Sequence, residues 1–138
     1  FEKEQSHYAL APKPLTLNEW NDLGQMRVYI GTLLGSRMRL TGEEIVYYFC
    51  AKTMNFPLFV RARQDGDRIA QKGMQQLKKV SRIFIDEKIP LVERKRWPLL
   101  IDNDNDIMAV LAIRVNDKFS KVKRAEDDYI LVIEPASI

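Results

Sequence analysis

Residues Phe56–Asp102 read FPLFVRARQDGDRIAQKGMQQLKKVSRIFIDEKIPLVERKRWPLLID and carry the clearest structural patterns of the chain. In its first part, side chains at alternate positions face opposite sides, which predicts a strand over residues 58–63. The turn signal Asp65-Gly66-Asp67 ends this strand. Apolar residues then repeat at helical spacing and predict a helix over Gln75–Lys88. Pro90 suits the start of a second, short helix, because a missing amide is tolerated in the first turn.

Outside this stretch the apolar runs are short and rich in β-branched and aromatic residues. We expect strands over the following ranges: 26–34, 44–52, 99–101, 107–115 and 129–134. The connections between them are mostly short. The pattern predicts an α+β fold of mainly antiparallel or mixed β-sheet layers, sandwich-like, with one main helix and one short helix.

The start of the chain has little periodicity and contains two prolines. We interpret residues 1–14 as a tail or linker and residues 15–138 as one domain. The chain begins with Phe1 rather than Met, which favours a fragment of a longer protein.

Charge is distributed unevenly along the sequence. The net charge is only +3, yet residues 61–96 hold 11 basic and 5 acidic side chains. A basic centre with neutral or acidic flanks indicates one focused anionic partner rather than general adhesion.

The residue inventory argues against catalysis by this chain. The single histidine, His7, lies in the weakly patterned start, and the single cysteine, Cys50, lies in an apolar run. Because the only histidine lies in this weakly patterned start, we do not expect a Ser–His or Cys–His pair. One histidine and one cysteine cannot build an ordinary zinc site. Asp102, Asp104 and Asp106 alternate as in a calcium loop but lack its glycine and glutamate, so we interpret them as a solvated hairpin turn. We therefore predict no catalytic residue, no metal site and no cofactor in this chain.

Two further observations indicate the cellular compartment of the protein. No apolar run approaches the roughly 20 residues that a membrane span requires, and one cysteine allows no intrachain disulfide. We expect a cytoplasmic protein without a membrane partner.

Several ordered elements of residues 56–102 resemble the C-terminal domain of tRNA(Ile)-lysidine synthetases. The family pattern opens F-P-L-x-V-R-x-R-x-x-G-D-R-I and continues with a glycine and a lysine pair. It then runs F-I-D-x-K-I-P and closes R-x-x-W-P. In this chain the elements are Phe56–Ile69, Gly73 with Lys78-Lys79, Phe84–Pro90, and Arg94 with Trp97-Pro98. The resemblance is strongest over residues 56–102 and weak elsewhere.

The resemblance implies a function for the parent protein. Enzymes of this family are ligases that use ATP with magnesium, and free lysine, to convert the wobble cytidine of an isoleucine tRNA with a CAU anticodon to lysidine. The C-terminal part is thought to hold the acceptor stem. The domain also resembles a module of the phenylalanyl-tRNA synthetase β-subunit that has a layered sheet architecture.

Two departures from the family limit the analogy. The strand after the W-P element carries an aromatic residue and a glycine in many relatives, but here it reads Met108-Ala109-Val110-Leu111-Ala112. The S-G-G-x-D-S adenylation loop of the catalytic domain is not in this sequence. We therefore expect this chain to be inactive alone and to work with its own N-terminal catalytic domain.

The basic residues of this region form the candidate tRNA contact, because guanidinium and ammonium groups bind the phosphates of an A-form stem. We expect the contact to be made by Arg61, Arg63, Arg68, Lys72, Lys78, Lys79, Arg82, Arg94 and Arg96. Arg61 or Arg63 could instead pair with Asp65 or Asp67 and hold the turn together.

Two other functions remain open at this point. The first is a protein-interaction or dimerisation domain that positions the catalytic domain, with a second copy of the chain as its partner. The second is an independent small enzyme, which the missing nucleophile–base pair disfavours. Salt-sensitive tRNA binding without turnover distinguishes the tRNA-binding domain from both.

Overall fold

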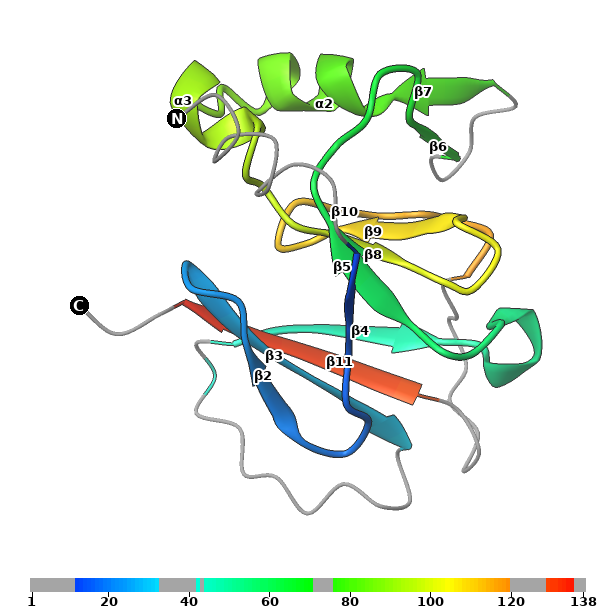
Figure 1. Ribbon diagram of the computed structural model, residues 1–138. Helices are drawn as coiled ribbons and strands as arrows, with labels where there is room; N and C mark the ends of the chain where they lie inside the picture. The colour runs from blue at the N-terminus through cyan, green and yellow to red at the C-terminus, as the bar shows by residue number, and fades with distance from the viewer. Residues whose placement is uncertain (1–11, 33–41, 43, 71–75, 120–128, 136–138) are drawn as a thin grey trace. The chain divides into compact units, whose positions relative to one another are not determined.

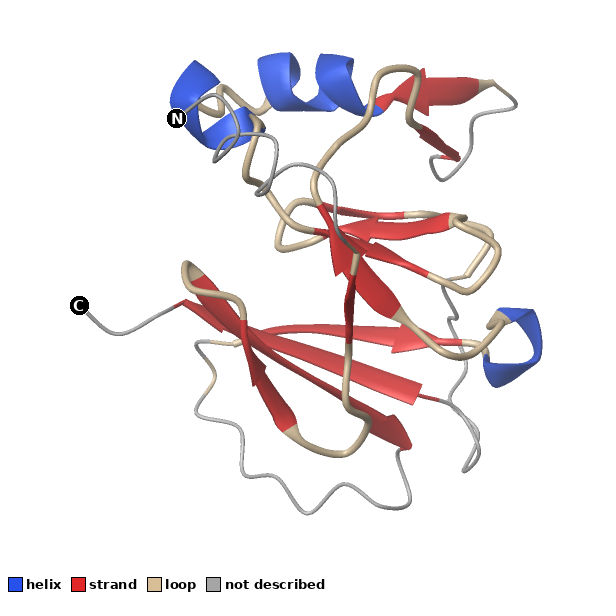
Figure 2. Ribbon diagram, in the orientation of Figure 1, coloured by secondary structure: helices blue, strands red, loops and turns tan. Residues whose placement is uncertain are grey.

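The computed structural model describes residues 12–32, 42, 44–70, 76–119 and 129–135. Contacts between Cα atoms divide the chain into two compact units. Unit 1 comprises residues 1–14 and 55–118, and unit 2 comprises residues 15–54 and 119–138. Figures 1 and 2 show that strands predominate in both units.

Unit 1 contains a five-stranded antiparallel sheet in the order β1-β5-β8-β9-β10. Its strands are β1 (Lys13–Pro14), β5 (Phe59–Arg61), β8 (Leu99–Ile101), β9 (Ile107–Val110) and β10 (Arg114–Val115). Lys13 and Pro14 fall in the segment that the sequence assigned to a tail, yet they pair with Val60 and Phe59. A separate antiparallel ribbon joins β6 (Arg68–Ala70) to β7 (Leu77–Lys79).

Two helices follow the ribbon, α2 (Val80–Asp86) and α3 (Leu91–Arg94). Val80, Ile83 and Phe84 are fully buried and lie on one face of α2, as residues three and four apart do. They pack against residues of β6, β8 and β9 in one apolar cluster, so α2 covers one face of the five-stranded sheet.

Trp97 anchors the chain beneath α2. Its ring packs edge-on against Phe84, with centroids 6.5 Å apart, and its indole N–H donates to the Leu111 carbonyl oxygen over 2.8 Å. The half-buried Trp97 therefore packs its ring on apolar neighbours and also has a hydrogen-bond partner for its indole N–H.

The main helix is shorter than the sequence predicted. The prediction placed its start at Gln75, but residues 77–79 are extended and pair with residues 68–70. The ribbon satisfies the backbone of this segment, and the Val80 amide donates to the Asp67 carbonyl at 2.9 Å. Helical periodicity reaching back to Leu77 was misleading, since Leu77 is exposed rather than buried.

The helix α2 ends at Asp86, two residues before the predicted end at Lys88. Lys88 adopts a left-handed conformation with φ of 58°. The amides of Lys88 and Ile89 donate to the carbonyls of Ile85 and Phe84, at 3.0 Å each, and Ile89 packs on the apolar cluster. This Schellman arrangement ends the helix without a glycine.

The predicted strand over residues 107–115 is interrupted. Residues 111–113 form a turn in which Ala112 has a φ of 68°, and the chain reverses so that Arg114 pairs with Val110. One apolar run thus supplies two strands, because a positive φ at a single residue is enough to reverse the chain.

Unit 2 contains a four-stranded antiparallel sheet in the order β2-β3-β11-β4. The strands are β2 (Trp20–Asp22), β3 (Met26–Thr32), β4 (Ile45–Phe49) and β11 (Tyr129–Pro135), and a 3₁₀ turn, η1, covers Ala51–Thr53. The most distant strand in sequence, β11, lies between β3 and β4.

These elements confirm the predicted α+β class, with mostly antiparallel sheets and few helices. Within the described ranges, no helix is long and apolar enough to cross a membrane.

Candidate nucleic-acid interface

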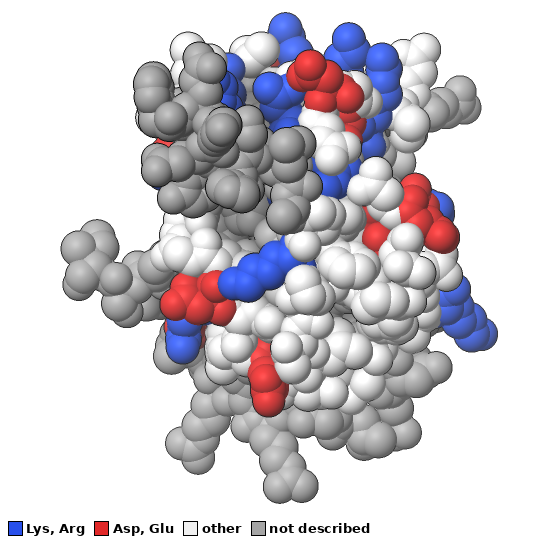
Figure 3. Space-filling model, in the orientation of Figure 1, with Lys and Arg blue, Asp and Glu red and all other residues white. Residues whose placement is uncertain are grey.

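The interface is built from the elements that carry the basic segment of unit 1. Figure 3 shows Lys and Arg side chains gathered over α2 and β7, with acidic side chains among them. The nine predicted residues differ in their surroundings. One is buried, several form ion pairs with acidic side chains, and two lie away from the others.

Arg61 does not lie on the surface, in contrast to its predicted place in the tRNA contact. Its side chain is 2% exposed and makes a two-pronged ion pair with Asp67, at 2.8 and 3.0 Å. Its Nε also donates to Asn105 Oδ1 at 2.9 Å. Alternation had placed it on an outer strand face, but Phe59, on the same face of β5, packs against the apolar cluster that contains the buried face of α2. Four of its five N–H donors are used within unit 1, by Asn105, the Ala62 carbonyl and Asp67, so little donor capacity remains for a phosphate.

Asp67 joins three parts of unit 1 through this pair. Its side chain holds Arg61 of β5 and accepts the Gln64 amide at 2.7 Å, while its carbonyl accepts the first amide of α2. The alternative that an arginine pairs with Asp67 and holds the turn is therefore what the structure shows.

Arg63 is paired more loosely than Arg61. Its guanidinium lies 3.6 Å from the Asp65 carboxylate, which is fully exposed. A solvent-facing pair of this length contributes little stability, so a phosphate can displace Asp65 from it.

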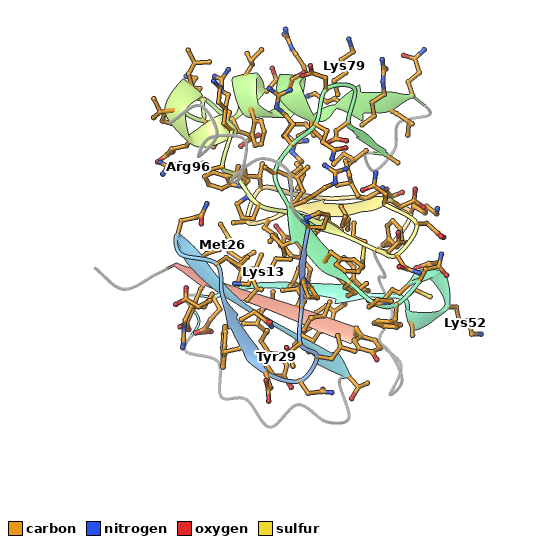
Figure 4. The ribbon with its side chains drawn as sticks, in the orientation of Figure 1. Lys13, Met26, Tyr29, Lys52, Lys79 and Arg96 are labelled. Carbon is orange, nitrogen blue, oxygen red and sulfur yellow. The ribbon has the colours of Figure 1, made fainter. Side chains whose placement is uncertain are left out.

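Arg68 and Lys79 form the outward cationic pair of the β6–β7 ribbon. Their Cα positions are directly opposite each other, so their side chains share one face, and both are exposed. The other face is fixed by the buried Ile69, opposite Lys78. Figure 4 shows Lys79 pointing away from the ribbon where β7 meets α2. Like charges directly opposite on a ribbon repel each other, and an anion bound between them relieves the repulsion.

Lys78 and Arg82 converge on a single carboxylate. Lys78 Nζ lies 2.5 Å from Asp86 Oδ2, and Arg82 Nε lies 3.2 Å from Asp86 Oδ1. The hydrogen bond from Lys78 is the main cause that lowers the pKa of Asp86, and the nearby charges of Lys78, Arg82 and Arg114 lower it further. Lys78 thus reaches this site from a strand and not, as predicted, from the helix.

Two members lie apart from this group, beyond the end of α2 that is farther from β7: Arg94 is the last residue of α3, and Arg96 follows it (Figures 1 and 4). Arg94 Nε donates to the Ile89 carbonyl at 2.7 Å and so supports the α2–α3 connection. Arg96 is exposed. Lys72 falls outside the described residues.

The loop after β8 contains a feature that sequence reasoning missed. Asp102 was interpreted as part of a solvated turn, but it is 1% exposed, and its Oδ1 accepts the amides of Asp104 and Asp106 at 2.9 and 3.0 Å. Alternating aspartates at a strand end were the available signal for this carboxylate-capped loop. Within the ranges that the structure describes, no group of three or more His, Cys, Asp or Glu side chains is arranged to hold a metal ion.

Comparison with known proteins gives the family of the chain. The family described as TilS substrate C-terminal domain matches residues 58–130, which is more than half of the 138 residues. The tRNA(Ile)-lysidine synthase of Bacillus licheniformis is 44% identical over 80 residues, covering 58% of this chain and 17% of that protein. The synthase of Bacillus subtilis strain 168 is 44% identical over 69 residues, covering 50% and 15%.

Solved structures agree on the fold. A crystal structure of a TilS C-terminal domain superposes with a TM-score of 0.77 at 24% identity, covering 93% of this chain and 98% of the other. An N-terminal fragment of the phenylalanyl-tRNA synthetase β-subunit from Pyrococcus horikoshii gives 0.54 at 14% identity, covering 66% and 28%. The aligned part spans less than a fifth of the length of the two synthases. The family match, over more than half of the chain, shows that this chain belongs to the TilS substrate C-terminal domain family.

Proposed function

We propose that this chain is the non-catalytic, tRNA-binding C-terminal domain of a tRNA(Ile)-lysidine synthetase. It holds the acceptor-stem region of the isoleucine tRNA with a CAU anticodon. A separate N-terminal catalytic domain uses ATP with magnesium, and lysine, to convert the wobble cytidine to lysidine. The family membership and the names of the similar synthases support this proposal.

The observation that carries the RNA contact is the outward pair of Arg68 and Lys79. The two cations face each other across the ribbon, and neither has an ion-pair partner among the described residues. Arg82, 64% exposed, extends the positive surface onto α2. Charges in this arrangement suit the closely spaced phosphates of a helical stem, which is recognised mainly through shape and backbone.

The test is a binding titration of the chain with the cognate tRNA over a series of salt concentrations. Lys79→Ala should weaken binding and reduce the slope of log K against log salt by about 0.9, the contribution of one phosphate contact on a duplex. Lys52→Ala is the matched control, because Lys52 is an exposed lysine on η1 of unit 2, outside the basic segment. Equal behaviour of the two variants would refute the proposed interface.

A protein-interaction or dimerisation function is the second candidate, and one observation favours it. Leu91 and Val92 of α3 are each 74% exposed, more than any other large apolar residue in the described part of the chain. Analytical ultracentrifugation tests this candidate. Self-association that Leu91→Ser abolishes, together with unchanged behaviour in the presence of tRNA, would support it over RNA binding.

A further inference from the structure

The Asp86 carboxylate occupies an anion position on the same surface as the proposed RNA contact. Two cations from different elements converge on it, Lys78 from β7 and Arg82 from α2, at 2.5 and 3.2 Å. The three side chains remain partly open to solvent, at 33% exposure for Asp86, 22% for Lys78 and 64% for Arg82. The group is therefore a surface cluster that an incoming ligand can reach.

The neighbouring residue provides a contrast. Glu87 is the next residue in the chain and is similarly exposed, but it pairs with Arg114 at 2.8 Å rather than with the cations of the proposed interface. Arg68 and Lys79, next to the cluster along the ribbon, have no such internal anion among the described residues. Asp86 thus neutralises two predicted RNA contacts at once, whereas Asp65 and Asp67 each pair with a single arginine.

We propose that Asp86 is a specificity-determining residue that competes with phosphate for Lys78 and Arg82. While Asp86 holds both cations, an isolated anion gains little by replacing it. An RNA backbone that also contacts Arg68 and Lys79 presents several phosphates at once and displaces the carboxylate. The surface then selects a polyanionic stem over small phosphates. This inference rests on the proposed function.

The energetics of exposed ion pairs support such an exchange. A carboxylate and a phosphate form the same kind of charge-assisted hydrogen bond with Lys and Arg. Solvent-exposed ion pairs contribute little to stability, so the pair that Asp86 makes is weak enough to open. For a ligand held at several points, a phosphate near Lys78 is present at high effective concentration, whereas a free phosphate is not.

Asp86→Asn removes the competing charge and keeps the shape of the side chain, and Glu87→Gln is the matched control. We expect Asp86→Asn to bind a short RNA duplex about three- to fivefold more tightly than the wild type, which is the factor that corresponds to opening one surface pair. It should bind inorganic pyrophosphate more tightly as well, by at least the same factor, so that selectivity for RNA does not rise. Glu87→Gln should change both affinities by less than half as much.

A second readout follows Asp86 itself in the wild-type chain. The carbon NMR signal of its carboxyl group should shift on addition of the RNA duplex and stay unchanged on addition of pyrophosphate at the same phosphate concentration.

Three results would overturn the inference. They are weaker RNA binding by Asp86→Asn, an equal gain with Glu87→Gln, and an Asp86 signal that RNA leaves unchanged. If Lys79→Ala still weakens binding in that case, the proposed function survives and only the role of Asp86 fails. If neither the wild type nor Asp86→Asn binds RNA, both proposals fail together.

Discussion

Substituting Asp67 by Asn should destabilise the chain strongly, although Asp67 lies in a turn. The change leaves the Arg61 guanidinium, only 2% exposed, without its counter-charge. Breaking a buried ion pair by removing one partner costs about 3–5 kcal/mol. The introduced amide oxygen can still accept one of the existing hydrogen bonds, so we expect the lower end of that range, about 3 kcal/mol.

Urea unfolding followed by circular dichroism measures this change, and a thermal melt provides a second reading. For a chain of this size, about 3 kcal/mol corresponds to a fall in Tm of roughly 10 °C. Asp65→Asn is the control. Asp65 lies in the same turn but is fully exposed, and its carboxylate makes only a long ion pair of 3.6 Å with Arg63. It should leave the urea midpoint essentially unchanged.

A double variant separates the buried charge from simple loss of contacts. Arg61→Met combined with Asp67→Asn removes the unpaired charge and should be more stable than Asp67→Asn alone. If Asp67→Asn and Asp65→Asn unfold at the same urea concentration, or if the double variant is no more stable than Asp67→Asn, the assignment of Arg61 to the interior is wrong.

Three further predictions concern α2 and the turn between β5 and β6. Phe84→Ala should lower the free energy of unfolding by about 3–5 kcal/mol, because Phe84 is fully buried, whereas Ile85→Ala, at a position 49% exposed, should cost much less in the same urea experiment. Gly66→Ala should cost about 1 kcal/mol, because φ is 87° and a Cβ would meet nothing within 4 Å, so the cost is conformational only; thermal melts should show a small fall in Tm. The pKa of Asp86 is lowered in the folded chain, so the ionised carboxylate stabilises the fold at pH above its unfolded pKa near 3.8. This stabilisation is lost as the pH falls through the folded pKa. Urea unfolding measured from neutral to strongly acidic pH should show this loss in the wild type and not in Asp86→Asn.

In the proposed RNA-binding surface, the basic residues of residues 61–96 differ in how freely they can contact phosphate. Arg68 and Lys79 are the cations best placed to meet a phosphate backbone, and Arg82 becomes available to it when Asp86 is displaced. Lys78 is available once Asp86 is displaced, whereas Arg61 works through the fold by fixing the turn from which β6 begins. Substituting an exposed cation therefore tests RNA affinity, whereas substituting Arg61 tests the stability of the fold. Both the free energy of unfolding and the affinity must be measured for each variant.

Local patterns in the sequence determined most of the elements. Alternation predicted the strands around Val60 and Val28, and the spacing of Val80, Ile83 and Phe84 predicted the buried face of α2. These predictions were confirmed because side-chain periodicity depends only on the local backbone. The ordered motif in residues 56–102 likewise indicated the family, which the comparisons confirmed.

Only the tertiary structure decided which cations are exposed. From the sequence, Arg61 and Arg63 are equivalent positions on one strand face, yet in the folded chain the first is buried with Asp67 and the second is partly open. The start of α2 was misplaced for a related reason, since residues 77–79 pair with β6 instead of extending the helix. Strand pairing, burial of a charge and the convergence of Lys78 and Arg82 on Asp86 all join residues that local periodicity treats independently, so they emerge only when the chain has packed.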